Sequence, residues 1–81
     1  MTAKEMFEAL GYELINSGNI IEYIDDKHGD GDYKFVNFSR MWKEYAVGYF
    51  DGYETKRREP SRVTIKEHEA ITKQMKELGW I

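Results

Sequence analysis

Apolar residues near the C-terminus recur with the period of an α-helix. At 100° per residue, Ile71, Met75 and Leu78 fall together with His68 within about 80° of the helix circumference. Lysine and glutamate residues occupy the opposite side. This pattern predicts an amphipathic helix over residues 65–78, with its apolar stripe facing the core and His68 half-buried on that stripe.

Both ends of the chain carry the same signals for starting and stopping a helix. A Thr-x-x-Glu capping box opens each segment, at Thr2–Glu5 and at Thr64–Glu67. A Leu-Gly-aromatic sequence closes each segment, at residues 10–12 and 78–80, where the glycine is a natural left-handed stop. We therefore expect a second, N-terminal helix of about eight residues, which is too short to be stable without docking on the rest of the fold.

The segment between the helices has the pattern of strands and turns. The sequence YELINSGNIIEYID contains a short strand, an Asn-Ser-Gly-Asn turn and a second strand over Ile20–Asp25. Two more strands follow at Tyr33–Ser39 and Lys43–Phe50, and DGYETKRREPSR is expected to be a loop. Short links favour an antiparallel meander. The predicted fold class is α+β: a short N-terminal helix, a four-stranded antiparallel meander and a longer C-terminal helix packed on one sheet face.

Apolar residues on both faces of the predicted sheet suggest an interaction surface. Two short helices can cover about one face, and tyrosine suits a position that is half exposed to water. We therefore predict a non-enzymatic protein-interaction module that binds a protein partner, or a second copy of itself, through the uncovered aromatic face. Curved small sheets also use aromatic residues simply to fill both sides. The predicted contacts are Trp42, Tyr45, Tyr49 and Tyr53.

The composition indicates a small globular protein of one domain. The 81 residues fit one domain, residues 1–81, and 41% of them are hydrophobic, which is typical of a globular chain. No cysteine is present, so disulfides and thiolate chemistry are excluded. The first residues do not resemble a signal peptide, and no apolar run approaches the length of a membrane span. The sequence therefore predicts a cytoplasmic protein without a membrane partner.

Charge is divided unevenly along the chain, and this bears on a second candidate function, the binding of single-stranded nucleic acid. Residues 1–54 carry eleven acids and five bases, net −6, whereas residues 55–81 carry four acids and seven bases, net +3. A basic loop next to sheet aromatics could bind single-stranded nucleic acid, with bases stacking on rings. The acidic excess of the strands argues against nucleic acid and favours a solvated loop. The basic residues concerned are Lys56, Arg57, Arg58 and Arg62.

Other candidate chemistry is weak. The turn DDKHGDGDYKFVN has the spacing of a calcium loop, but it places His28 and Asn37 at the third and twelfth positions, where oxygen ligands and a glutamate belong. The carboxylates of this turn lie in water, where their pKa values have no reason to separate into acid and base roles. No nucleophile motif, phosphate-binding loop or dinucleotide fingerprint is present. We predict no catalytic residues, metal, cofactor or small-molecule substrate.

Three segments also carry a resemblance to a known family. The ending VTIKEHEAITKQMKELGWI, the opening TAKEMFEALGYELI and the central IIEYID resemble small uncharacterised proteins encoded in phages, prophages and mobile elements of Gram-positive bacteria. The similarity is clearest over residues 1–25 and 62–81. It implies a bacterial cytoplasm, a phage-linked origin and an unknown function. It supplies no catalytic or binding residues.

Overall fold

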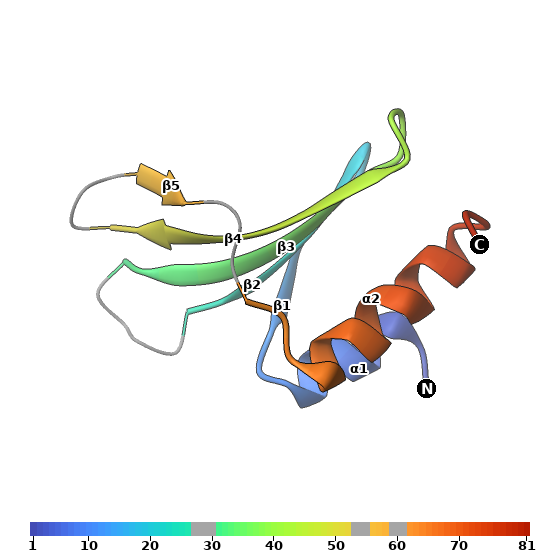
Figure 1. Ribbon diagram of the computed structural model, residues 1–81, viewed down its shortest axis with the longest axis horizontal. Helices are drawn as coiled ribbons and strands as arrows, with labels where there is room; N and C mark the ends of the chain where they lie inside the picture. Colours follow the sequence, from blue (N-terminus) through green and yellow to red (C-terminus); the bar gives the residue numbers. More distant parts are fainter. Residues whose placement is uncertain (27–30, 53–55, 59–61) are drawn as a thin grey trace.

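Two helices lie against one side of an antiparallel sheet in the computed structural model, which describes residues 1–26, 31–52, 56–58 and 62–81 (Figure 1). The helices are α1 (Ala3–Ala9) and α2 (Ile65–Glu77). The strands are β1 (Glu13–Ser17), β2 (Ile20–Asp25), β3 (Tyr33–Ser39), β4 (Glu44–Asp51) and β5 (Lys56–Arg58), in the spatial order β1-β2-β3-β4-β5. The α+β class and the antiparallel meander of β1 to β4 are confirmed.

The helix ends follow the local signals in the sequence. Both predicted capping boxes are present, with Thr2 and Glu5 at α1 and Thr64 and Glu67 at α2. The two closing glycines adopt positive φ, and the aromatic residue after each returns a backbone hydrogen bond to the helix, over 3.0 Å from Tyr12 to Phe7 and 2.9 Å from Trp80 to Met75. The capping boxes and the glycine stops are thus confirmed as predicted from the sequence.

The segment predicted as a loop before α2 contains a fifth strand. β5 pairs with the end of β4, so that Lys56 is opposite Asp51 and Arg58 is opposite Tyr49. The prediction of a loop over the whole of DGYETKRREPSR was therefore wrong. The run Lys-Arg-Arg lacks the β-branched and aromatic residues that mark strands in a sequence, and pairing with the neighbouring strand creates the strand instead.

Aromatic side chains form the contact between the helices and the sheet. Phe7 of α1 is fully buried and stacks on Tyr23 of β2, with ring centroids 4.1 Å apart. Phe7 also meets the rings of Tyr12 and Phe38 edge-on. The buried cluster that joins the helices to the sheet is completed by smaller side chains: Ile21, Val36, Ala70 and Ile71.

The side of α2 that faces the core is more polar than its sequence pattern suggests. Its buried residues are Glu67, Ala70, Ile71 and Gln74, while His68 is exposed. The expectation of a half-buried His68 was wrong. The buried side of α2 is rotated toward Ala70 relative to the side that the apolar pattern predicts. His68 therefore lies outside the contact with the sheet.

Candidate interaction surface

The junction between the helices and the sheet contains a buried polar cluster centred on Glu67. Its carboxylate accepts hydrogen bonds from the Tyr12 hydroxyl, from Lys34 Nζ at 2.8 Å and from the Thr64 backbone amide at 2.8 Å. Glu67 is 6% exposed. Three segments therefore meet at one carboxylate: the chain after α1, strand β3 and the start of α2. No buried side-chain polar atom among the described residues lacks a hydrogen-bond partner.

The hydrogen bonds of this cluster determine its protonation. Burial raises the pKa of the Glu67 carboxyl, but the bonds from Lys34, Thr64 and Tyr12 outweigh burial, and the net pKa is lowered. Burial, together with the Glu67 bond, raises the pKa of the Tyr12 hydroxyl. Glu67 is thus held as a carboxylate and Tyr12 as a phenol. This arrangement joins helix to sheet, and it does not poise either group to exchange protons near neutral pH.

A very different surface lies at the turn between β3 and β4, at the end of the sheet opposite β5, at the upper right of Figure 1. The turn residues 40–43 are held by several hydrogen bonds. The Lys43 amide donates to the Ser39 carbonyl over 2.9 Å, and the Arg40 amide donates to the Asn19 carbonyl over 3.0 Å. Arg40 Nε also donates to the Gly18 carbonyl over 2.7 Å, which ties this turn to the turn between β1 and β2. Lys43 has a φ of 52°, in the left-handed region.

This bonding leaves large apolar side chains in water. Met41 is 73% exposed and Trp42 is 70% exposed, both within the turn. Ile20, opposite Ser39, is 42% exposed on one side of the sheet, and Tyr45 is 47% exposed on the other. We call these four residues the apolar tip. Isolated exposed apolar residues are ordinary, but two on a hydrogen-bonded turn, with two more on the strands beside it, are typical of a binding surface.

The four residues predicted to form one interaction surface do not lie together on an uncovered face of the sheet. Trp42 lies at the apolar tip, as an exposed residue. Tyr45 and Tyr49 share the side of β4 that carries Val47, because Val47 pairs with core Val36 and Tyr45 pairs with core Phe38. They therefore point to the side that the helices cover, and their assignment to an uncovered face was wrong. Sequence alone could not settle this, since only the register against β3 shows which side of β4 meets the helices.

Further contacts separate Tyr49 from the apolar tip. The Tyr45 ring packs against buried Phe38 at a centroid distance of 5.9 Å and still keeps part of its surface exposed. The Tyr49 hydroxyl donates to Asp32 over 2.8 Å at the far end of the sheet, and Tyr49 is half-buried. Tyr53 lies outside the described residues.

The opposite sheet face is not an open aromatic surface either. Phe35 belongs to that face, because it alternates with core Val36, and yet it is fully buried. The Tyr33 ring stacks on Phe50 at a centroid distance of 4.9 Å, and both residues are half-buried. The large exposed apolar residues in the described part of the sheet are therefore found at or near the tip end, not across a face.

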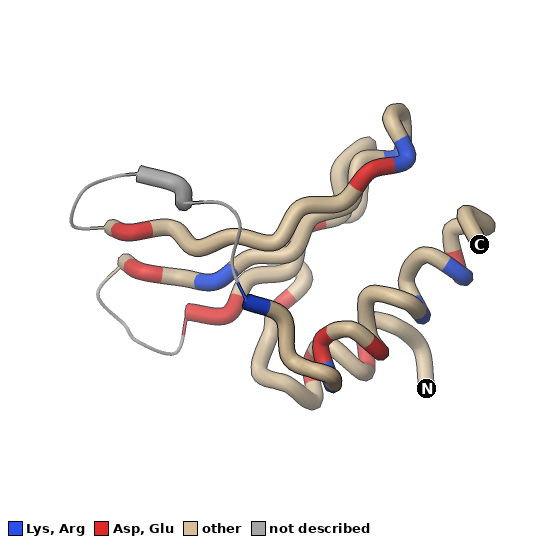
Figure 2. The backbone as a smooth tube through the Cα atoms, viewed as in Figure 1, with Lys and Arg blue, Asp and Glu red and all other residues tan. Residues whose placement is uncertain are grey.

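The basic residues of the alternative prediction lie near acidic residues. For Lys56, Arg57 and Arg58 only the backbone is described, and it forms β5 beside the end of β4. Figure 2 shows acidic residues at this end of the sheet, where β2 finishes at Asp25 and β4 at Asp51. Arg62 is exposed, and its carbonyl accepts a hydrogen bond from Lys34 Nζ over 2.6 Å.

The described residues form neither a cluster of metal ligands nor a helix that could span a membrane. Across residues 1–26, 31–52 and 62–81, no three His, Cys, Asp or Glu side chains come close enough to hold a metal ion. His28 and Asp30 of the calcium-like turn fall outside the residues described. Neither α1 nor α2 has the length and apolar content that a transmembrane helix requires.

Sequence reasoning missed two members of the apolar tip, Met41 and Ile20. A signal for Met41 was present: the strands are linked by Arg-Met-Trp-Lys, a turn with two large apolar residues and neither Gly nor Pro. No comparable signal marked Ile20, because only the register against β3 shows that Ile21, and not Ile20, faces the core.

Comparisons with known proteins identify no relative of this chain. No family model matches the sequence, and neither a curated protein nor a solved structure is significantly similar to it. The resemblance to proteins of phages and mobile elements stays a prediction.

Proposed function

We propose that this protein is a non-enzymatic interaction module that binds another protein through the apolar tip. The observation that carries the proposal is the exposure of Met41 and Trp42, at 73% and 70%, on a turn whose backbone is already fixed by hydrogen bonds. A rigid turn loses little conformational freedom on binding, so burial of its side chains is converted efficiently into affinity. Tryptophan is also among the residues that most often dominate binding energy at interfaces.

The shape of the surface favours a foreign partner over a second copy. The tip is a projection made of four side chains, whereas a standard interface uses roughly 20–30 residues a side. A projection is complementary to a pocket, whereas self-association through the tip would bring two projections together. We therefore favour a partner with an apolar pocket, in the bacterial cytoplasm that the resemblance to phage-encoded proteins implies.

The test is affinity capture from a bacterial lysate with wild-type protein and with the double variant Met41→Ser/Trp42→Ser. The matched control is Ile65→Ser, because Ile65 is 77% exposed and lies on α2, away from the tip. A genuine partner is captured by wild type and by the control but not by the double variant, and its purified form binds with the same ranking. Capture that does not change with the double variant contradicts the proposal.

Two simple measurements address the other predicted partners. Light scattering at high concentration tests self-association, and a dimer that the double variant abolishes would identify a second copy as the partner. Retention on heparin or single-stranded DNA at low salt tests nucleic-acid binding, which is strongest under that condition. Retention that falls steeply with salt would favour the basic segment over the tip.

A further inference from the structure

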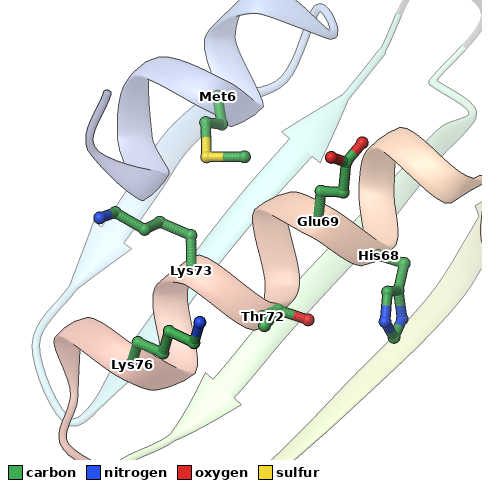
Figure 3. Close-up of a pocket in the computed structure, with 6 residues that line it drawn as sticks. All are labelled: Met6, His68, Glu69, Thr72, Lys73 and Lys76. Carbon is green, nitrogen blue, oxygen red and sulfur yellow. The ribbon is translucent and has the colours of Figure 1, made fainter.

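A groove runs between α1 and α2 on the side that faces away from the sheet. It comprises two hollows, of about 360 Å³ and about 180 Å³, which share Met6 and Glu69 as lining residues and are therefore neighbours on one surface. Figure 3 shows the larger hollow, with Met6 pointing from α1 toward α2, between Lys73 and Glu69, while the strands lie behind the helices. The groove is separate from the apolar tip and shares no residue with it.

The groove is fixed by contacts at both ends of the helix pair. The Ala3 amide at the start of α1 donates to Glu77 at the end of α2 over 2.8 Å. At the other end, Tyr12 after α1 donates to Glu67 in the first turn of α2. The two helices are therefore antiparallel, and the hydrogen bonds at their ends fix the groove between them without a ligand.

The apolar lining of the groove comes from α1 and the residues beside it, and it includes two methionines. Met6 lines both hollows, and Met1, Ala9 and Leu10 line the smaller one. Met1 is 76% exposed. Methionine side chains are flexible and polarizable, so grooves lined by them accommodate varied apolar side chains.

The rim of the groove is basic. Lys66 lines the smaller hollow, Lys73 and Lys76 line the larger one, and Glu69 is the acidic residue that lines both. The ion pairs among the described residues join Lys4 to Glu8 and Lys34 to Glu67, so neither of them uses a lysine of this rim. On a chain of net charge −3, the groove is thus a local basic surface.

We propose that this groove binds an acidic amphipathic helix of a partner protein. The apolar lining on the α1 side suits the apolar side of a third helix, and the lysines of α2 attract acidic residues beside that side. The stretch from Lys66 to Lys76 spans about 15 Å along α2, which corresponds to roughly three turns of a bound helix. This inference does not depend on the proposed role of the apolar tip.

The experiment is a binding titration with a designed helical peptide of about fourteen residues, with leucine on one side and glutamate on the other. The variant is Lys66→Glu/Lys73→Glu, which reverses two rim charges. A glutamate at position 66 is compatible with the N-terminal turn of α2. The matched control is Lys43→Glu, a single charge reversal at the tip. A second peptide carries lysine in place of every glutamate.

We expect the acidic peptide to bind wild type and Lys43→Glu alike, and to bind the double variant about tenfold more weakly, with a loss that shrinks as salt is added. NMR shifts of Met6 and Leu10 should report the bound state. The proposal is overturned if the basic peptide binds equally well, if the double variant binds like wild type, or if the shifts map to Met41 and Trp42. Thermal unfolding of each variant verifies that the fold is retained.

Discussion

The helix–sheet junction and the apolar tip reverse the usual placement of polar and apolar groups. At the junction, a carboxylate that is 6% exposed is surrounded by hydrogen-bond donors. At the tip, the tryptophan side chain is 70% exposed and is not part of the core. Breaking a buried ion pair costs several kcal/mol, whereas an exposed apolar side chain contributes little to stability. The difference teaches that the junction stabilises the fold, whereas the exposed side chains of the tip contribute little to its stability.

The largest expected effect is at the junction. Glu67→Ala removes the carboxylate that pairs with Lys34, leaves the Tyr12 hydroxyl without its acceptor and removes half of the capping box, so we expect a loss of about 3 kcal/mol in the free energy of unfolding. Urea denaturation followed by circular dichroism measures this loss. Glu67→Gln keeps an acceptor oxygen and should lose less. A loss below about 0.5 kcal/mol for Glu67→Ala would remove the contrast between the two regions.

The second prediction concerns acid. Because the folded-state pKa of Glu67 is lowered, the stability that its charge contributes is present above the unfolded-state pKa of about 4.3 and is lost as the pH falls through the folded-state value. Wild type should therefore lose stability between pH 5 and pH 3 more steeply than Glu67→Gln, at roughly constant ionic strength. Parallel pH profiles of the two proteins would show that Glu67 is not the group responsible.

The third prediction concerns the backbone of the tip. Lys43 has a φ of 52°, where glycine has no steric penalty, so Lys43→Gly should raise the free energy of unfolding by up to about 1 kcal/mol. Lys43→Ala lacks this gain and separates the backbone effect from loss of the charge. Thermal unfolding measures both. A destabilised Lys43→Gly variant would indicate that the lysine side chain itself holds the turn.

The smallest expected effect is at the exposed side chains. Met41→Ser/Trp42→Ser should change the free energy of unfolding by no more than about 0.5 kcal/mol, because neither side chain is buried. The matched buried change is Phe38→Ala, expected to cost about 3 kcal/mol. Chemical denaturation of both variants makes the comparison. A large loss for the tip variant would mean that these side chains support the fold, and it would weaken the proposed function.

The hydrogen-bond partners of the buried tyrosines at the junction could not be predicted from the sequence. Tyr23 donates to Gln74 over 2.6 Å, and the two residues are 51 positions apart. Burial, with the charges of Glu77 and Glu8, raises the pKa of Tyr23 to about 12. Tyr12 and Glu67 are 55 positions apart. Such pairs depend on how α2 is seated on the sheet, which no local pattern specifies.

The sequence by itself determined where the helices begin and end and where the first four strands lie. Capping boxes, closing glycines and turn residues act through contacts within a few residues of the chain, so they do not depend on how distant segments pack. Only the tertiary structure decided which face of the sheet meets the helices, that Glu67 and Gln74 are buried, that β5 pairs with β4 and that Met41 and Trp42 stay in water. These outcomes depend on strand register and on contacts between distant segments, where a shift of one residue moves every side chain to the other face.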